Sequence, residues 1–373
     1  MNPSESLSPT KNAKRLPRFA LVFYGILVPC VGLYIAFLIS PSFSDFFNRH
    51  ISSVVRAALA YLTGWLPFSL AEYLLLSLPL ILFLLIRLGI KKYSDSWRDV
   101  LIFCATVLSV ASLIFSSFVL GFAPAYRGTT LEEKLSLDRR AVSAEELYET
   151  ATILAEAVNR EAVRLGYSEA TQFSVMPFSY SEMNDKLMDA YSSTAEKYDF
   201  LSHFSSRLKP VMLSYPMSYT HITGIYTFFT GEANLNVHFP DYTLPYTAAH
   251  ELSHQRGIAR EDEANFMAFL VCLESDDAYI RYSGYLNLYE YVASALYSAS
   301  PELYWQLNAS LSPSVRAEMS AYSDFFDSFR DSVASEVSET VNNATLILHG
   351  TEGVKSYGMV VELAVAYYLP SQS

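Results

Sequence analysis

Three long apolar segments in the first third of the chain restrict its possible folds more than any other feature. Residues 19–39 and 100–122 contain no charged side chain, and residues 67–86 contain only Glu72. A helix of about 20 apolar residues is long enough to cross the hydrocarbon layer of a membrane. A cleavable signal peptide is the alternative for the first segment, but that segment is long for one and no small-residue cleavage site follows it. Residues 1–122 are therefore predicted to form a membrane anchor of three transmembrane α-helices.

The basic residues predict how this anchor is oriented. They gather before the first apolar segment and between the second and the third, at Lys11, Lys14, Arg15, Arg18, Arg87, Lys91, Lys92 and Arg98. Three crossings put both clusters on the same side of the membrane, and Lys and Arg are enriched in cytoplasmic loops. We therefore expect a multi-pass protein of the cell membrane with a cytoplasmic N-terminus. All residues after the third segment are then extracytoplasmic.

The charge of the chain changes sign after the anchor. Residues 1–128 carry 11 Lys or Arg and 5 Asp or Glu, a net charge of +6, whereas residues 129–373 carry 15 and 33, a net charge of −18. A domain this acidic would repel the phosphate backbone of a nucleic acid. The expected partners are therefore the lipid bilayer and a peptide or protein substrate, with no nucleic acid. No feature of the sequence sets an oligomeric state.

The rest of the chain has the pattern of a mostly helical α+β domain. Residues 123–142 are polar and are expected to be a linker, and residues 143–373 are expected to form one extracytoplasmic domain. Ser143 and Glu146 have the spacing of a helix capping box, which predicts a helix start. Residues 178–213 are predicted to be helical and amphipathic.

A strand signal and a helix signal follow one another in the middle of this domain. The run between Gly224 and Gly231 is rich in β-branched and aromatic residues, which predicts one or two short strands. Pro245 suits the first turn of a helix, and Gly257 is a natural helix end. We expect a helix between these two residues.

Two histidines lie four residues apart in that predicted helix. His250 and His254 share one helix face, so their imidazoles can converge on one ion, and zinc accepts nitrogen ligands readily. Glu251 lies next to His250 and points beside such an ion, where it can take a proton from a zinc-bound water. The other interpretation is a surface helix with two solvated histidines. The small or apolar neighbours Ala249 and Leu252, and the acidic helix that follows, favour a metal site.

The third ligand is expected from the following acidic helix. Glu261 and Glu263 are two residues apart, so on a helix they point in nearly opposite directions and only one should reach the ion. Asn265 is four residues after Glu261 and shares its face, where it could form a hydrogen bond with a ligating histidine. We therefore predict His250, His254 and Glu261 as the zinc ligands, with Glu263 as the alternative to Glu261.

These residues resemble the glutamate-zincin metallopeptidases, in which His-Glu-x-x-His is followed by Glu-x-x-x-Asp. Here Asn265 replaces the aspartate, and the gap between His254 and Glu261 is short for that class. Most of the chain is also similar to an uncharacterised bacterial membrane family, domain of unknown function 3810. This second similarity rests on the three apolar segments, on Tyr126-Arg127, and on the segments 229–236, 250–266 and 353–363.

The resemblance to zincins implies a zincin-like fold with an edge strand that pairs with an extended peptide beside the active-site helix. Residues 225–236 are the candidate strand. Glu232, Asn234 and Asn236 alternate along one side of it and are predicted to line the substrate cleft. The other interpretation is that these three polar residues form turns.

Peptide hydrolysis also needs a group that stabilises the developing oxyanion, often a tyrosine or a histidine. The candidates are Tyr282, Tyr285, Tyr289 and Tyr357. Tyr357 follows Lys355 and Ser356 after a glycine and is the first choice for a catalytic role beside Glu251. A packed loop next to a core helix is the competing interpretation of this segment.

The sequence as a whole predicts a membrane-anchored, zinc-dependent metallopeptidase that uses a Glu-activated water. Two alternatives remain at this point. The domain could bind zinc without catalysis, as a membrane scaffold or sensor, or it could be a zinc hydrolase of cell-envelope material. The short cytoplasmic segments include no output domain, which speaks against a signalling role.

Overall fold

The computed structural model of the protein describes residues 14–330, 332, 334–336, 340 and 356–370; the side chains of residues 356–358 are outside this description. Three of the described helices are long and apolar enough to cross a membrane, as predicted: α1 (Arg18–Ile39), α4 (Leu70–Tyr93) and α5 (Trp97–Gly121). A capping serine directly precedes each of α4 and α5. The side chains of these residues, Ser69 and Ser96, accept a hydrogen bond from a backbone N–H in the first turn of the helix.

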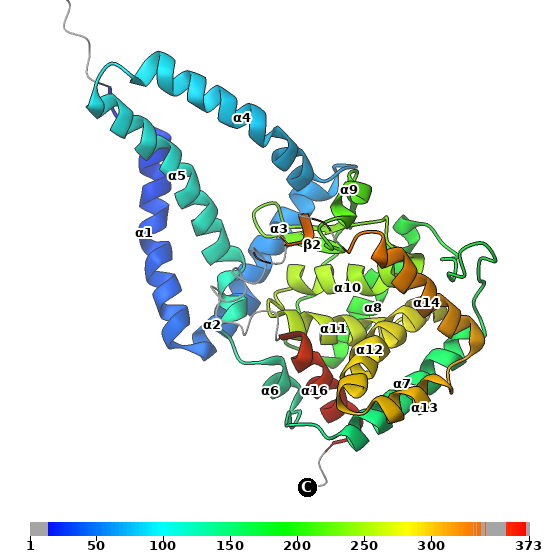
Figure 1. Cartoon of the computed structure of the whole chain (residues 1–373). Helices are drawn as coiled ribbons and strands as arrows, with labels where there is room; N and C mark the ends of the chain where they lie inside the picture. The colour runs from blue at the N-terminus through cyan, green and yellow to red at the C-terminus, as the bar shows by residue number, and fades with distance from the viewer. Residues whose placement is uncertain (1–13, 331, 333, 337–339, 341–355, 371–373) are drawn as a thin grey trace, which may run out of the picture.

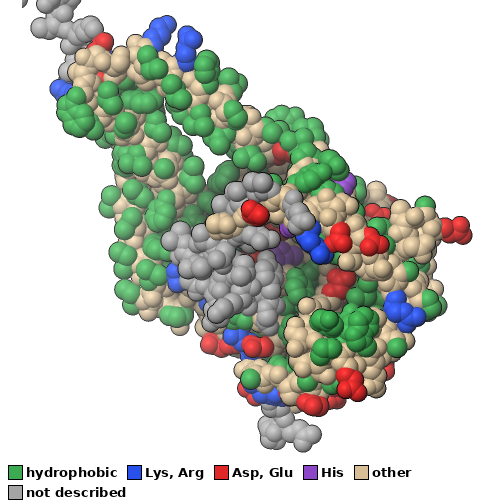
Figure 2. All heavy atoms as spheres, viewed as in Figure 1, with side chains coloured by type: hydrophobic (Ala, Val, Ile, Leu, Met, Phe, Trp, Pro, Cys, Tyr) green, Lys and Arg blue, Asp and Glu red, His purple; other side chains and the backbone are tan. Residues whose placement is uncertain are grey.

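These three helices form an arm that projects from the rest of the molecule (Figure 1). The helices α1 and α5 pack side by side, whereas α4 separates from α5 as it approaches the domain. Apolar side chains cover the arm, and most acidic side chains in this view lie on the domain (Figure 2). No residue of α4 is buried, as expected of a helix that faces lipid.

Short elements connect α1 to α4 at the base of the arm. They are α2 (Pro41–Phe47), a π-helical turn η1 (Asn48–Ser52) and α3 (Ser53–Gly64). The α3 helix is amphipathic. Its outer face exposes Val54, Tyr61, Leu62 and the following Trp65. Its inner face buries Arg56 and Ala60 against the domain.

The domain is mostly helical, and its elements follow the chain in this order: η2 (Ala123–Tyr126), α6 (Leu131–Leu135), α7 (Ala144–Ala162), α8 (Tyr180–Lys197), β1 (Lys209–Pro210), α9 (Ser214–Ser218), β2 (Gly224–Thr227), β3 (Glu232–Leu235), η3 (Asp241–Thr243), α10 (Leu244–Gln255), α11 (Glu261–Leu273), α12 (Ala278–Ala299), α13 (Pro301–Asn308), α14 (Pro313–Asp327) and α16 (Ser356–Tyr368). The core lies around α11 and α12, which pack against each other and against α7, α10 and α16. The capping box predicted at Ser143 is confirmed at the start of α7.

The strands form one small sheet in the order β1-β3-β2. β3 is central, parallel to β1 and antiparallel to β2, with Ile225 opposite Asn234. β2 therefore lies at the edge of the sheet, and both β2 and β3 contact α10. The prediction of one or two short strands in this region is confirmed by β2 and β3.

The helix predicted over residues 178–213 is wrong beyond Lys197. There α8 ends, and Tyr198 has an extended backbone. Distant polar groups hold the segment that follows: Asn184 donates to Ser206 O and accepts from Leu208 N–H, and the Arg256 guanidinium donates to Phe204 O. These contacts satisfy backbone groups that a helix would have paired internally.

Candidate metal centre

Two consecutive helices carry the candidate site. Pro245 lies in the first turn of α10, which ends at Gln255. Gly257 follows with φ +90°, a left-handed conformation that glycine adopts without steric cost. This turn reverses the chain, and Glu261, the first residue of α11, faces the two histidines of α10.

The structure brings together the three residues predicted as ligands. His250 Nε2 lies 3.2 Å from Glu261 Oε2, and His254 Nε2 lies 3.6 Å from Glu261 Oε1. Among the described residues, this is the cluster of histidine, cysteine and acidic side chains that could hold a metal ion, and its ligand atoms all lie within 4.8 Å of one another.

The donor geometry fits zinc. A tetrahedral ion with bonds of about 2.0–2.1 Å separates its ligand atoms by roughly 3.3 Å, close to the two distances between histidine nitrogens and carboxylate oxygens. His254 Nδ1 lies 2.8 Å from Ile258 O. Because a carbonyl only accepts, Nδ1 carries a proton, so Nε2, which faces Glu261, is the nitrogen that would bind a metal ion after losing its own proton. A backbone contact of this kind fixes the orientation of a ligating imidazole.

The electrostatics of the cluster favour a cation. Burial by itself would raise the pKa of Glu261, but His254 and His250 lower it far below its usual value. Burial would lower the pKa of His254, whereas the charge of Glu261 and its hydrogen bond raise it. The Glu261 carboxylate therefore stays ionised, and its negative charge favours protonated histidines beside it. A bound dication could replace the positive charge of those protons.

Glu251 lies beside this cluster, against the edge strand. Its side chain is buried, and the Tyr226 N–H of β2 donates to its carboxylate. A Cβ on Gly224 would lie 2.6 Å from Glu251 Cγ and 2.7 Å from Oε1, so the strand can approach Glu251 only because residue 224 has no side chain. Burial raises the pKa of Glu251, although His250 and His254 partly oppose this. A raised pKa suits a carboxylate that must accept and release a proton near neutral pH.

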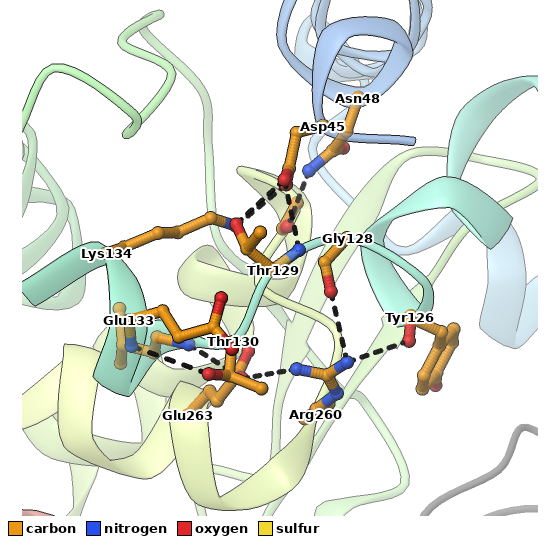
Figure 3. Close-up of polar contacts among 12 residues, drawn as sticks. Asp45, Asn48, Tyr126, Gly128, Thr129, Thr130, Glu133, Lys134, Arg260 and Glu263 are labelled. Atoms are coloured by element: carbon orange, nitrogen blue, oxygen red, sulfur yellow. Dashed lines mark hydrogen bonds and ion pairs between the residues drawn. The ribbon is translucent and has the colours of Figure 1, made fainter. Parts of the chain in front are cut away.

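Glu263 has other partners. Arg260 Nη1 lies 2.7 Å from Glu263 Oε1, and the Leu131 N–H donates to the same oxygen at 2.9 Å. Figure 3 shows Glu263 beside Arg260 and the chain segment that leaves α5. The structure therefore places Glu261, and not Glu263, with the histidines.

Asn265 lies in α11 one turn after Glu261, and its backbone O accepts a hydrogen bond from Tyr246 Oη at 3.0 Å. Its side-chain Nδ2 is buried and has no hydrogen-bond partner among the described atoms, and the same holds for His250 Nδ1. The predicted hydrogen bond between Asn265 and a ligating histidine is therefore not formed between Asn265 Nδ2 and His250 Nδ1, and both nitrogens are left without a partner among the described atoms.

The three residues predicted to line a cleft hold the sheet instead. Glu232, Asn234 and Asn236 are at most 1 % exposed. Glu232 accepts hydrogen bonds at 2.9 Å from the N–H groups of Leu70 and Ala71 at the start of α4. Asn234 Nδ2 donates to Ile225 O, and Asn236 Nδ2 donates to Ile222 O. Most of their polar atoms are paired inside the protein, although Asn234 Oδ1 is buried without a hydrogen-bond partner, and in this structure none of the three side chains is open to solvent.

The three tyrosines proposed for the oxyanion whose side chains are described, Tyr282, Tyr285 and Tyr289, have partners away from the cluster. Tyr282 is buried and donates to Glu318, and Tyr289 is buried in the core. Tyr285 packs against Phe269. Tyr357 lies in the first turn of α16, and its side chain is outside the described residues.

Two aromatic residues that sequence reasoning did not assign to the site come from the anchor side. The ring of Phe122, directly after α5, packs edge-on against His254 with centroids 6.2 Å apart. Tyr126 packs against Phe122. Burial, and secondly the charge of Glu261, raise the pKa of Tyr126 well above its usual value. No local pattern links residues 122 and 126 to a motif more than 120 residues later.

Hydrogen bonds tie both helices of the site to the anchor and to the segment that follows it. At the end of α10, Arg56 donates to Arg256 O at 3.3 Å and to Gly121 O at 2.7 Å, and Asn48 donates to Gly257 O at 3.0 Å. At the start of α11, Arg260 donates to the carbonyl oxygens of residues 126 and 128 (Figure 3). The segment expected as a polar linker is thus a packed part of the site's support.

Arg56→Met should lower the thermal midpoint of the purified protein by roughly 5 °C or more. Arg56 is fully buried, and its loss leaves the carbonyl groups of Gly121 and Arg256 without this donor, which costs about 1–3 kcal/mol for each group left unsatisfied. The matched control is Arg49→Met, because Arg49 pairs with Asp199 on the exposed surface and such pairs contribute little. Equal midpoints for the two variants would contradict this account of the junction.

The comparisons with known proteins identify a family and no further relative. No curated protein and no solved structure matches the chain. The model of one family, described as a protein of unknown function (DUF3810), matches residues 47–365. This match begins in α2, includes α4, α5 and the cluster of His250, His254 and Glu261, and ends within α16. Because it spans most of the 373 residues, the chain belongs to the DUF3810 family.

Proposed function

We propose that this protein is a membrane-anchored, zinc-dependent peptidase of the glutamate-zincin type. The observation that carries the proposal is the convergence of His250, His254 and Glu261, with Glu251 buried beside them against an edge strand. The proposal includes a zincin-like arrangement of the domain, with β2 as the strand that pairs with an extended substrate. It also includes the orientation predicted from the basic loops, with the domain outside the cell.

The roles of the residues follow from their positions. His250, His254 and Glu261 would hold the ion, and zinc when bound would supply Lewis acidity toward a water molecule and a carbonyl oxygen. Glu251 would accept the proton of the attacking water at its carboxylate. It would then deliver that proton to the amide nitrogen as the peptide bond breaks. The Tyr226 N–H donates to the Glu251 carboxylate and orients it, and the absence of a side chain at Gly224 leaves room for it.

Metal analysis together with a cleavage assay tests this proposal. The full chain, purified in detergent, should contain one zinc ion per molecule. It should cleave peptides from a mixed-sequence library, with the products read by mass spectrometry. A zinc chelator should abolish cleavage, and added zinc should restore it. A protein that retains no zinc at neutral pH, or whose cleavage is indifferent to the chelator, would refute the proposal.

Gly224→Ala should reduce kcat/KM by about 100-fold, because displacing a catalytic group by about 1 Å has an effect of that size. The new methyl group would overlap Glu251, which must move, while the ligands on α10 and α11 keep their positions. Zinc content should therefore stay at the parent value. Gly166→Ala is the control, since a Cβ there meets no atom within 4 Å. Parent-like activity of Gly224→Ala would show that this strand does not position Glu251.

A further inference from the structure

We infer that the substrate is a polypeptide held in the same membrane by an apolar helix and cut close to the membrane surface. This inference rests on the proposed peptidase function and on the proposed crossing of the membrane by α1, α4 and α5. It concerns where the scissile bond must lie, which the metal cluster alone does not determine. Three features of the junction between arm and domain lead to it.

The first feature locates the membrane surface. The α3 helix connects the end of α1, through α2 and η1, to the start of α4, so it runs across the base of the arm (Figure 1). Its outer face exposes Tyr61 by 60 %, Leu62 by 68 % and Trp65 by 75 %. Tyrosine and tryptophan are enriched where the hydrocarbon meets the headgroups, and an amphipathic helix with such a face lies in the plane of that boundary. The outer surface of the bilayer is therefore at α3.

The second feature is the short distance from this surface to the site. The inner face of α3 carries Arg56, which donates to the backbone of Arg256, two residues after His254. Phe122, the residue that directly follows α5, contacts the His254 ring. Phe228, in the turn between β2 and β3, packs against Phe118 in the last turn of α5, with ring centroids 5.4 Å apart. The metal cluster and the edge strand therefore lie one layer of side chains from the outer end of a membrane-crossing helix.

The third feature is that hydrogen bonds hold the site in this position. A peptidase domain on a flexible tether could turn away from the membrane to reach soluble proteins. Here the end of α10 is bound to Asn48 and Arg56, and the start of α11 is bound through Arg260 to the segment that leaves α5. Gly257 is also required, because a Cβ at this position would collide with the Arg56 guanidinium. Opening the junction would break the bonds of Arg56 and Asn48 to the end of α10 and those of Arg260 to residues 126 and 128.

These features favour one class of substrate. A polypeptide anchored in the same bilayer is confined to the layer in which the site lies, and such confinement raises its effective concentration without any new contact. An extended chain advances about 3.3 Å per residue, so ten residues beyond the apolar helix already span about 33 Å. We therefore expect cleavage within about ten residues of the end of the substrate's membrane helix.

The distance of the site from the membrane surface can be measured without an assay of cleavage. A fluorophore on Phe229→Cys, in the β2–β3 turn, should be quenched by lipids that carry a spin label at the headgroup. The same fluorophore on Val163→Cys, at the far end of α7, should not. Both side chains are exposed, by 41 % and 86 %, and both variants are made in a Cys104→Ser background because Cys104 is the exposed native thiol. Equal quenching at the two positions would overturn the inferred placement.

Substrate preference is tested with the full chain reconstituted in phosphatidylcholine vesicles. The probe is a library of 20-residue random segments, either fused to a Leu/Ala membrane helix or supplied free. The fused segments should be cut about tenfold faster or more, as expected when a tether raises the effective concentration to the millimolar range, with cuts clustered within the first ten residues. Equal rates, or cuts spread evenly along the segment, would overturn this inference and leave the peptidase function standing. Absence of cleavage in both forms, with zinc bound, would overturn both.

Discussion

Glu251→Gln is expected to keep one zinc ion per chain and to lose peptide cleavage by about 10²–10⁴-fold, the contribution typical of a positioned acid–base group. Glutamine has nearly the same shape as glutamate and can occupy the same buried space between Gly224 and the histidines. It cannot accept the proton of the attacking water, and it has none to deliver to the amide nitrogen. The three ligand side chains are unchanged, so metal binding should not depend on this substitution.

Two measurements on the same preparation test this effect. Mass spectrometry gives the zinc content, and cleavage of one defined peptide gives kcat/KM. Gly166→Ala again serves as the control for handling and folding. Parent-like cleavage by Glu251→Gln would remove Glu251 from the mechanism. Loss of zinc together with activity would instead show that residue 251 supports the ion.

Glu261→Ala is expected to weaken zinc binding by about 100-fold or more, the upper range reported for loss of groups that merely support a ligand. The cluster would then retain two imidazoles, and zinc sites in enzymes have three protein ligands. Glu263→Ala is the matched comparison two residues away on the same helix. It should retain zinc, because Glu263 faces Arg260 and the Leu131 N–H.

Competition with a chromogenic chelator gives the zinc affinity of both variants, and thermal unfolding in detergent gives their stability. Glu263→Ala should unfold at a lower temperature, since the partly buried Arg260 loses its carboxylate partner. If Glu263→Ala loses zinc while Glu261→Ala keeps it, the assignment of the third ligand is wrong.

Local properties explain what could be predicted from the sequence. The spans predicted over residues 19–39, 67–86 and 100–122 match α1, α4 and α5 within a few residues at most boundaries, because length and absence of charge suffice to recognise such helices. The exception is the end of α4, which continues through the basic loop to Tyr93. The capping box at Ser143 and the helix end before Gly257 are likewise set by residues within one turn.

The sequence pattern did not show which partners a side chain meets in the folded protein. The alternation of Glu232, Asn234 and Asn236 shows that they share a side of a strand, but it does not reveal what lies opposite. For Glu232 the partners are two N–H groups at the start of α4, more than 160 residues earlier. The helix predicted up to residue 213 ended at Lys197 because Asn184 and Arg256 bind the backbone that follows.

The sequence by itself determined the chemistry of the candidate site and the presence of the apolar helices. Both depend on residue types at short, regular spacings, since a helix repeats every 3.6 residues and a membrane span needs about 20. Only the tertiary structure decided that Glu261 rather than Glu263 meets the histidines, that Gly224 makes room for Glu251, and that Arg56 binds the end of α10 to the anchor. Each of these is a contact between separate elements of the fold, and such contacts exist only once those elements pack.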